Sequence, residues 1–264
     1  MKIYLINLAR RPDRLAAMQA EAARLGLALT RIDAVDAKTE ALPQARFEQA
    51  GPLGEIPAGD KACFLSHEKA WQALVAGGED HAVILEDDVV LSPSAARFLK
   101  DTSWLPAGVD LVKLEHYGPA SQSVLLSDFR KIERREMGAG FAVARMHSRH
   151  TGGAAYIVSR RAARTLVAQK RIALPVDHLL FNPNNSPLAR ELQPWQLLPA
   201  IARQKDFVGA PSDIEKSRKP LRKLTLTYIK RELVRFGYDL KLLPRQIALA
   251  LTGKAKFTRI RTDQ

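Results

Sequence analysis

One stretch of the chain joins an apolar run to three consecutive acids. Residues 82–85, Ala-Val-Ile-Leu, lead directly into Glu86, Asp87 and Asp88. A short run of branched apolar residues predicts a strand that is buried on both faces. Adjacent carboxylates repel each other and are costly to bury without a cation, so the strand must end at a surface. A hard divalent ion such as Mn²⁺ or Mg²⁺ fits such a cluster, and a solvated strand end is the alternative.

Strand and helix signals alternate before this stretch. Lys2–Leu8 and Leu27–Ile32 predict strands, and residues 12–25 between them predict a helix. A second helix, over residues 60–76, leads to the strand that begins at Ala82. Strand, helix and strand at this spacing predict a parallel sheet. We therefore expect the α/β class, with a mostly parallel, Rossmann-like sheet flanked by helices.

The rest of the apolar pattern predicts shorter and partly amphipathic strands, which are typical of antiparallel edges. Ser159 is expected to cap the helix that follows it. The expected helices are Ser94–Lys100 and Arg160–Gln169, and the expected strands are Val109–Leu114, Val124–Leu126, Ile132–Arg135, Phe141–Arg145, a segment opened by a glycine pair at Thr151–Ser159, and Leu197–Ala202.

Basic residues are concentrated at the end of the chain. The net charge is +13 over 264 residues, and residues 216–264 hold 14 basic and 3 acidic side chains. We expect residues 1–215 to form the α/β domain and residues 216–264 to form a basic, helical C-terminal tail. Basic segments with apolar patches bind anionic membranes, so the tail is expected to contact one unless it is merely solvated. Nucleic acid is not expected, because the aromatic residues of the tail form no regular stacking pattern.

The single cysteine, Cys63, excludes an internal disulfide and a cysteine-built zinc site. The first apolar run is too short for a signal peptide, and no run is long enough to span a membrane. These features predict a cytoplasmic protein held peripherally at a membrane by residues 216–264. The sequence leaves the oligomeric state open.

Parallel strands with crossover helices place ligands beyond the carboxyl ends of the strands. Residues 7–14, residues 33–36 and the three acids at 86–88 follow three such ends, so they should line one crevice. Arg10, Arg11 and Arg14 are candidates for phosphate contacts there, and surface charge is the alternative.

Three further positions combine groups that can carry chemistry. His67 lies on a mainly apolar helical stripe, so it is either a core histidine or a residue facing the crevice. Asp177 and His178 offer a general base and a metal ligand, or a helix cap beside a surface residue. Gly152 and Gly153 open a strand and allow close approach of a ligand, or else form a bulge.

Several ordered motifs together resemble glycosyltransferase family 25, the family of bacterial lipooligosaccharide galactosyltransferases. The resemblance spans roughly residues 2–181. It implies a GT-A nucleotide-sugar-binding fold, a UDP-sugar donor, a Mn²⁺-type ion and an inverting transfer. The motifs that carry it are YLINLARRPDR at Tyr4–Arg14, DAVD at Asp33–Asp36, CFLSH at Cys63–His67 with Trp71, ILEDD at Ile84–Asp88, GGAAY at Gly152–Tyr156 and PVDH at Pro175–His178.

The resemblance assigns roles to residues at the matching positions. Glu86, nearest the strand, would reach the donor ribose and the metal, and Asp88 would ligate the metal. Asp177 as catalytic base and His178 as a further metal ligand follow from their chemistry more than from the family pattern. The expected donor-binding residues are Asn7, Leu8, Arg11, Arg14, Asp36, Ser66, His67, Glu86, Asp87, Gly153 and Tyr156.

The expected activity is transfer of a hexose, galactose by the resemblance, from a UDP-sugar to a lipooligosaccharide or another surface glycan. The expected place is the inner face of the bacterial cytoplasmic membrane. One rival is a non-catalytic GT-A-like protein that binds lipid or nucleic acid through its tail. Another is a metal-dependent nucleotidyltransferase, although no phosphate-cradling glycine loop follows the first strand.

Overall fold

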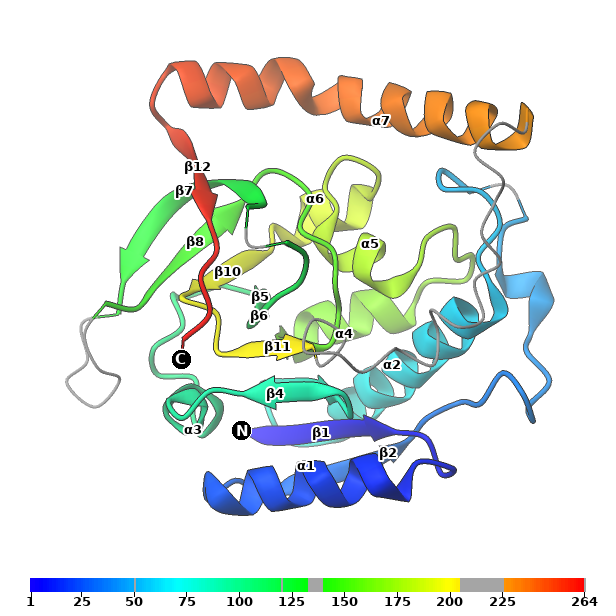
Figure 1. Cartoon of the computed structure of the whole chain (residues 1–264), viewed down its shortest axis with the longest axis vertical. Helices are drawn as coiled ribbons and strands as arrows, with labels where there is room; N and C mark the ends of the chain where they lie inside the picture. Colours follow the sequence, from blue (N-terminus) through cyan, green and yellow to red (C-terminus); the bar gives the residue numbers. More distant parts are fainter. Residues whose placement is uncertain (50, 120, 133–139, 205–225, 264) are drawn as a thin grey trace.

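A computed structural model describes residues 1–49, 51–119, 121–132, 140–204 and 226–263. Within these residues nine strands form one central sheet in the order β12-β7-β8-β10-β5-β9-β3-β1-β2 (Figure 1). Helices pack on the sheet, so the predicted α/β class is confirmed.

The predicted strand–helix–strand units lie at one end of this sheet. β1 (Lys2–Asn7) lies between β2 (Leu29–Asp33) and β3 (His81–Glu86) and is parallel to both. The crossovers are α1 (Pro12–Arg24) and α2 (Ala58–Ala76). All five elements agree with the sequence pattern to within a few residues.

The register brings the three strand ends level. Asn7 at the end of β1 is opposite Asp33 at the end of β2. Ile6 is opposite Glu86, the last residue of β3. The segments expected to line one crevice therefore do leave the sheet at one edge.

Beyond β3 the pairing is mixed, which corrects the expectation of a mostly parallel sheet. β9 (Ala155–Ser159) lies between β3 and β5 (Leu111–Lys113) and is antiparallel to both. β10 (Trp195–Leu198) is parallel to β5 but antiparallel to β8 (Ala142–Met146).

The strand predicted at 197–202 is divided between two sheets. Its first part belongs to β10, and the chain then enters β11 (Ala202–Gln204). β11 lies between β4 (Val89–Leu91) and β6 (Glu115–His116) in a small sheet of the described residues. The predicted strand at 132–135 falls mostly outside the described residues.

The core consists of two apolar layers, one on each face of the central sheet. Strand side chains alternate between them, so Ile84 packs in one layer and Leu85 in the other. The first layer includes residues of α2, α4 (Arg160–Val167) and α5 (Val176–Phe181). The second includes residues of α1 and of α3 (Ala95–Leu99).

Two shorter helical elements border the first layer. They are η1 (Gln44–Arg46) and α6 (Pro187–Leu192). Ser159 caps α4 as predicted, because its hydroxyl accepts a hydrogen bond from the Ala162 backbone NH at 3.0 Å.

The basic C-terminal segment is only in part an appendage. Its helix is confirmed as α7 (Leu226–Leu251), which crosses one side of the molecule (Figure 1). The chain then forms β12 (Ala255–Arg259), which is antiparallel to β7 (Ser123–Lys131) at the rim of the central sheet. This corrects the idea of a separate tail, because β12 covers an edge of β7 that would otherwise be open. The boundary at residue 215 stays a prediction, since residues 205–225 lie outside the described ranges.

Among the described helices, none is sufficiently long and apolar to cross a membrane.

Candidate functional site

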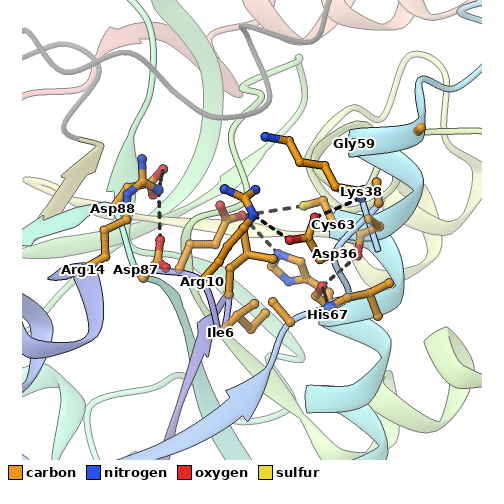
Figure 2. Close-up of a pocket in the computed structure, with 18 of the residues that line it drawn as sticks. Ile6, Arg10, Arg14, Asp36, Lys38, Gly59, Cys63, His67, Asp87 and Asp88 are labelled. Carbon is orange, nitrogen blue, oxygen red and sulfur yellow. Dashed lines mark hydrogen bonds and ion pairs between the residues drawn. The ribbon is translucent and has the colours of Figure 1, made fainter. Parts of the chain in front are cut away.

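A cleft of about 300 Å³ lies at the carboxyl ends of β1, β2 and β3 (Figure 2). Its walls come from the segment after β1, the loop 34–38 after β2, the first half of α2 and the acids after β3. The sequence-predicted residues among its lining are Leu8, Arg14, Asp36, Ser66, His67, Glu86, Asp87 and Asp88.

Three buried side chains and the half-buried Glu86 form a hydrogen-bonded row that ends at the cleft. Trp71 Nε1 donates to the Tyr156 hydroxyl at 2.8 Å. An indole can only donate, so the hydroxyl oxygen accepts there. Among the described residues, His67 Nδ1 at 2.8 Å is the acceptor recorded for the buried hydroxyl proton, so the hydroxyl donates to it. His67 therefore carries its proton on Nε2 and donates it to Glu86 Oε1 at 3.1 Å. Of the two expectations for His67, the structure supports a core residue whose ring also reaches the cleft floor.

Burial makes the two last members of this row neutral. It lowers the pKa of His67 to about 4, against the opposing charges of Glu115 and Asp177. Burial, followed by the charges of Glu115 and Asp87, raises the pKa of Glu86 to about 8. At neutral pH an uncharged imidazole thus faces an uncharged carboxylic acid. Glu86 accepts through Oε1 and keeps its own proton on the other oxygen, which is a donor for a ligand.

The two other acids are charged and held by bases. Asp87 accepts from Arg14 Nη1 at 3.0 Å on one oxygen and from Asn7 Nδ2 at 2.7 Å on the other. The same Arg14 nitrogen lies 3.6 Å from Asp88. Asn7 is buried and does not line the cleft, and its amide orients the Asp87 carboxylate, so a direct contact of Asn7 with the donor stays a prediction.

Arg10, and not Arg11, faces the cleft. Arg10 pairs with Asp36 at 2.5 Å, and Lys38 lies beside them on the cleft wall (Figure 2). Arg11 instead forms an ion pair with Asp13 at 2.7 Å outside the cleft. The sequence pointed to Arg10 as one of three basic residues in the segment that follows the first strand.

Ser66 shapes the cleft through the backbone. Its hydroxyl accepts from the Val35 backbone NH at 2.9 Å and donates to the Ala62 carbonyl at 2.7 Å. This contact ties the loop after β2 to α2, so Ser66 supports the wall that the loop forms.

The glycine pair and Asp177 are brought together, but neither lines the cleft. The Gly152 NH donates to Asp177 Oδ2 at 3.3 Å. Gly152 has φ +93°, and a Cβ there would lie 2.5 Å from Tyr117 Cβ, so only glycine fits. A Cβ on Gly153 would lie 3.7 Å from Asp177, so the backbone there sits directly against the acid. The charge of Asp177 raises the pKa of Glu86, which places the acid within electrostatic reach of the cleft.

A buried ion pair beneath this loop was not foreseen. Lys113 Nζ lies 2.9 Å from Glu115 Oε1 and also donates to the Gly152 carbonyl. Glu115 Oε1 accepts from the Ala154 NH at 2.8 Å. Both charged side chains are fully buried, which is costly unless every partner is in place. Their apolar strand context gave no sequence signal for this role.

The expected metal ligands do not all meet. His178 contacts Asn182 at 2.8 Å, within its own helix, and does not line the cleft. This corrects the expected position of His178 beside the acids, because its imidazole contacts Asn182, the residue that follows α5.

Within the described residues, one cluster of potential metal ligands has its donor atoms within 4.8 Å of one another: Cys63, His67 and Glu86. Burial raises the pKa of the Cys63 thiol, and the Nε2 proton of His67 already points at Glu86. The thiol and the imidazole make this cluster a poor match for Mg²⁺ or Mn²⁺, which prefer oxygen ligands.

Asp88 fits an oxygen-preferring divalent ion better. Its carboxylate lines the cleft, whereas both oxygens of Asp87 accept hydrogen bonds. Mg²⁺ and Mn²⁺ sites often use one or two carboxylates and complete the shell with substrate phosphates. Glu86 can join such a shell only after losing its proton.

Comparisons with known proteins agree on one family. The family described as glycosyltransferase family 25 (LPS biosynthesis protein) matches residues 1–180. The lacto-N-neotetraose biosynthesis glycosyltransferase LgtB of Neisseria gonorrhoeae is 30% identical over 227 residues, which cover 77% of this chain and 74% of the relative. LgtE of the same organism is 28% identical and covers 91% and 92%. The lipooligosaccharide biosynthesis protein lic2B of Haemophilus influenzae is 27% identical and covers 61% and 59%.

The family match covers more than half of the chain, including the whole cleft. It therefore agrees with the motifs at 4–14, 63–67 and 84–88 that the structure gathers around one site. The chain belongs to glycosyltransferase family 25 and is a glycosyltransferase.

Proposed function

We propose that the protein transfers a hexose, galactose, from a UDP-sugar to a lipooligosaccharide or related surface glycan. The observation that carries the proposal is the cleft itself, where three bases lie among four acids beyond the carboxyl ends of three parallel strands. The relatives suggest the acceptor class, because their names assign them to lacto-N-neotetraose and lipooligosaccharide biosynthesis.

The bases and the neutral acid suit different parts of the donor. Arg10, Arg14 and Lys38 line one cleft and provide charge for a diphosphate. The protonated oxygen of Glu86 provides a donor, and its partner oxygen an acceptor, for a ribose hydroxyl. Apolar lining such as Leu8 offers a surface for the uracil ring.

A divalent ion, Mn²⁺ or Mg²⁺, would be held by Asp88, with Glu86 as a second ligand once deprotonated. When bound it would neutralise the diphosphate and stabilise the leaving UDP. Arg14 adds positive charge that would also stabilise the diphosphate. Its contacts to Asp87 and Asp88 hold the guanidinium at the cleft.

Asp177 is the proposed base. The acceptor hydroxyl gives its proton to this carboxylate, its oxygen bonds to the anomeric carbon, and the bond from that carbon to the UDP oxygen breaks. Attack from the face opposite UDP inverts the anomeric configuration. Gly152 supports this role, because its backbone NH donates to the Asp177 carboxylate and holds it in place.

Donor binding can be tested by the change in melting temperature on adding UDP-sugars with and without Mn²⁺. We expect UDP-galactose to stabilise the wild type only with the metal, and Asp88→Asn to lose most of that shift. Asp13→Asn is the matched control, since Asp13 is exposed and lies outside the cleft. A full shift in Asp88→Asn, or in the wild type without metal, would exclude the proposed metal role.

The exposed side of α7 supports attachment to an anionic membrane, at the inner face of the bacterial cytoplasmic membrane. Six apolar residues recur at helical spacing along it, with exposed fractions between 41% and 83%. Such a stripe, next to basic side chains, inserts at a lipid surface while the charges meet anionic headgroups. The residues of this apolar stripe are Leu233, Phe236, Leu240, Leu243, Ile247 and Leu251.

Co-sedimentation with phosphatidylglycerol vesicles tests this attachment. We expect the wild type to sediment and Leu243→Glu/Ile247→Glu to bind at least about tenfold more weakly. Ala248→Glu/Thr252→Glu adds the same charge at exposed positions outside the stripe and should bind like the wild type. Equal binding by all three proteins would remove the stripe as the contact.

A further inference from the structure

A second cavity, of about 680 Å³, lies between α7, the α5–α6 connection and the segment that follows η1. It is separate from the cleft but shares supporting elements with it. Gly51 and Pro52 line this cavity, and Pro57 and Gly59 of the same segment line the cleft. Leu179 of α5 also lines the cavity, and the first turn of that short helix carries Asp177. The cavity is therefore connected through two elements to the site of transfer.

One polar atom in the wall lacks a partner. Asn185 lines the cavity and is only 3% exposed, yet its Oδ1 has no hydrogen-bond donor within the described structure. The turn that carries it is fixed, because the Ser186 NH donates to the Asn182 carbonyl at 2.9 Å. A buried amide oxygen without a donor costs free energy, and a ligand hydroxyl would satisfy it.

Positive charge surrounds the same space. Arg171, Arg190 and Lys241 line it, against the single acid Glu48. Arg171 forms no ion pair in the described part of the chain, and Lys241 lies over the Tyr238 ring at 4.6 Å without an acidic partner there. Exposed bases without acidic partners around a concave surface attract an anionic ligand.

We propose that this cavity binds a sugar bearing a phosphate or carboxylate group, as part of the acceptor glycan. The buried Asn185 oxygen would accept from a sugar hydroxyl, and Arg171 and Lys241 would hold the anionic group. The proposal rests on the proposed function, because it places an acceptor beside the helix that carries Asp177. It also accounts for α7, which closes the cavity on one side and presents the apolar stripe on the other.

Glucose 6-phosphate is a suitable probe, measured by saturation-transfer NMR with the cleft filled by UDP and Mn²⁺. We expect the wild type to bind glucose 6-phosphate, and to bind glucose and inorganic phosphate each at least about tenfold more weakly. Arg171→Glu/Lys241→Glu should weaken binding of glucose 6-phosphate by at least about tenfold while leaving UDP binding unchanged. The matched control is Lys170→Glu/Lys254→Glu, at exposed positions outside the cavity, which should bind the probe like the wild type.

Four results would overturn the proposal: no binding of the probe by the wild type, equal binding by the cavity variant, equal loss in the control, or phosphate alone binding as tightly. Asn185→Asp adds charge at the unsatisfied oxygen and should also weaken binding. If Asn185→Asp lowers the melting temperature, the surface variant Arg171→Glu/Lys241→Glu still tests whether the cavity binds the probe. Failure of UDP to bind the wild type would count against the proposed function and not against this cavity.

Discussion

Trp71 sets the direction of hydrogen bonding through Tyr156 and His67 to Glu86 because an indole has a proton to give and no acceptor. One side chain, remote from the cleft surface, thereby decides which nitrogen of His67 is protonated. Glu86 in turn presents a neutral carboxylic acid to the cleft, next to two charged aspartates.

The buried state of His67 predicts a pH-dependent stability. The native imidazole has a pKa of about 4 against 6.5 when unfolded, so the unfolded chain binds more protons between these values. The contribution of His67 to stability is therefore present above about pH 6.5 and is lost as the pH falls toward 4.

His67→Gln removes this dependence. The difference in unfolding free energy between wild type and variant should grow by about 3 kcal/mol from pH 4 to pH 6.5 and stay level above. Denaturant unfolding across this range measures it. The raised pKa of Glu86 acts in the opposite sense in both proteins, so it largely cancels in the difference. A difference that does not change with pH would contradict a buried neutral His67.

Single residues show where sequence reasoning stops. The acids at 86–88 were placed correctly, because a buried strand cannot continue through three carboxylates. Arg11 was preferred to Arg10, because a motif match does not say which side of a helix start faces the sheet edge. The Lys113–Glu115 pair was missed because the pattern of β5 does not show which neighbouring loop crosses it.

At the scale of elements, the turn between β1 and α1 places neighbouring arginines in different environments, since the Arg11 NH donates to the Leu8 carbonyl there at 2.9 Å. Arg10 and Arg14 face the cleft, whereas Arg11 turns to Asp13. The two positions 10 and 11 therefore form a matched pair for mutation.

Arg10→Ala should raise the donor KM about tenfold, because it removes a charged contact for the diphosphate. Arg11→Ala should leave the donor KM within about twofold. Initial rates at varied UDP-sugar concentration measure both values. Equal effects, or a larger effect at Arg11, would show that the segment after β1 contacts the donor differently.

Helices and strands were predictable where one segment contains both the apolar periodicity and the residues that begin and end the element. β1, α1, β2, α2 and β3 each carry their own periodicity and end signals, and their parallel order follows from the crossovers. The antiparallel pairing of β9 depends on partners far away in the chain, which no local pattern contains.

At the scale of the whole molecule, the chain closes its central sheet with its own C-terminal end. Lys256 and Phe257 of β12 are exposed and resemble a solvated tail in sequence, while Ala255 and Ile260 are buried. Only the partner strand β7 reveals that this segment belongs to the sheet.

A chain that ends at residue 251 should melt about 5 °C or more below the full chain, because it uncovers the edge of β7 and the site of Ile260. The apolar stripe variant Leu243→Glu/Ile247→Glu keeps β12 and should melt within about 1 °C of the wild type. Thermal unfolding compares the three proteins. An unchanged melting temperature on truncation would mean that β12 adds no stability.

The most direct measurement is the anomeric configuration and yield of the product formed from UDP-galactose and a lipooligosaccharide acceptor. UDP-galactose carries an α linkage, so direct displacement predicts β-linked galactose in the product, visible in its NMR coupling constants. Asp177→Asn should lose at least about a hundredfold in turnover while UDP-galactose still stabilises the protein. An α-linked product, or near-normal turnover in Asp177→Asn, would contradict the account.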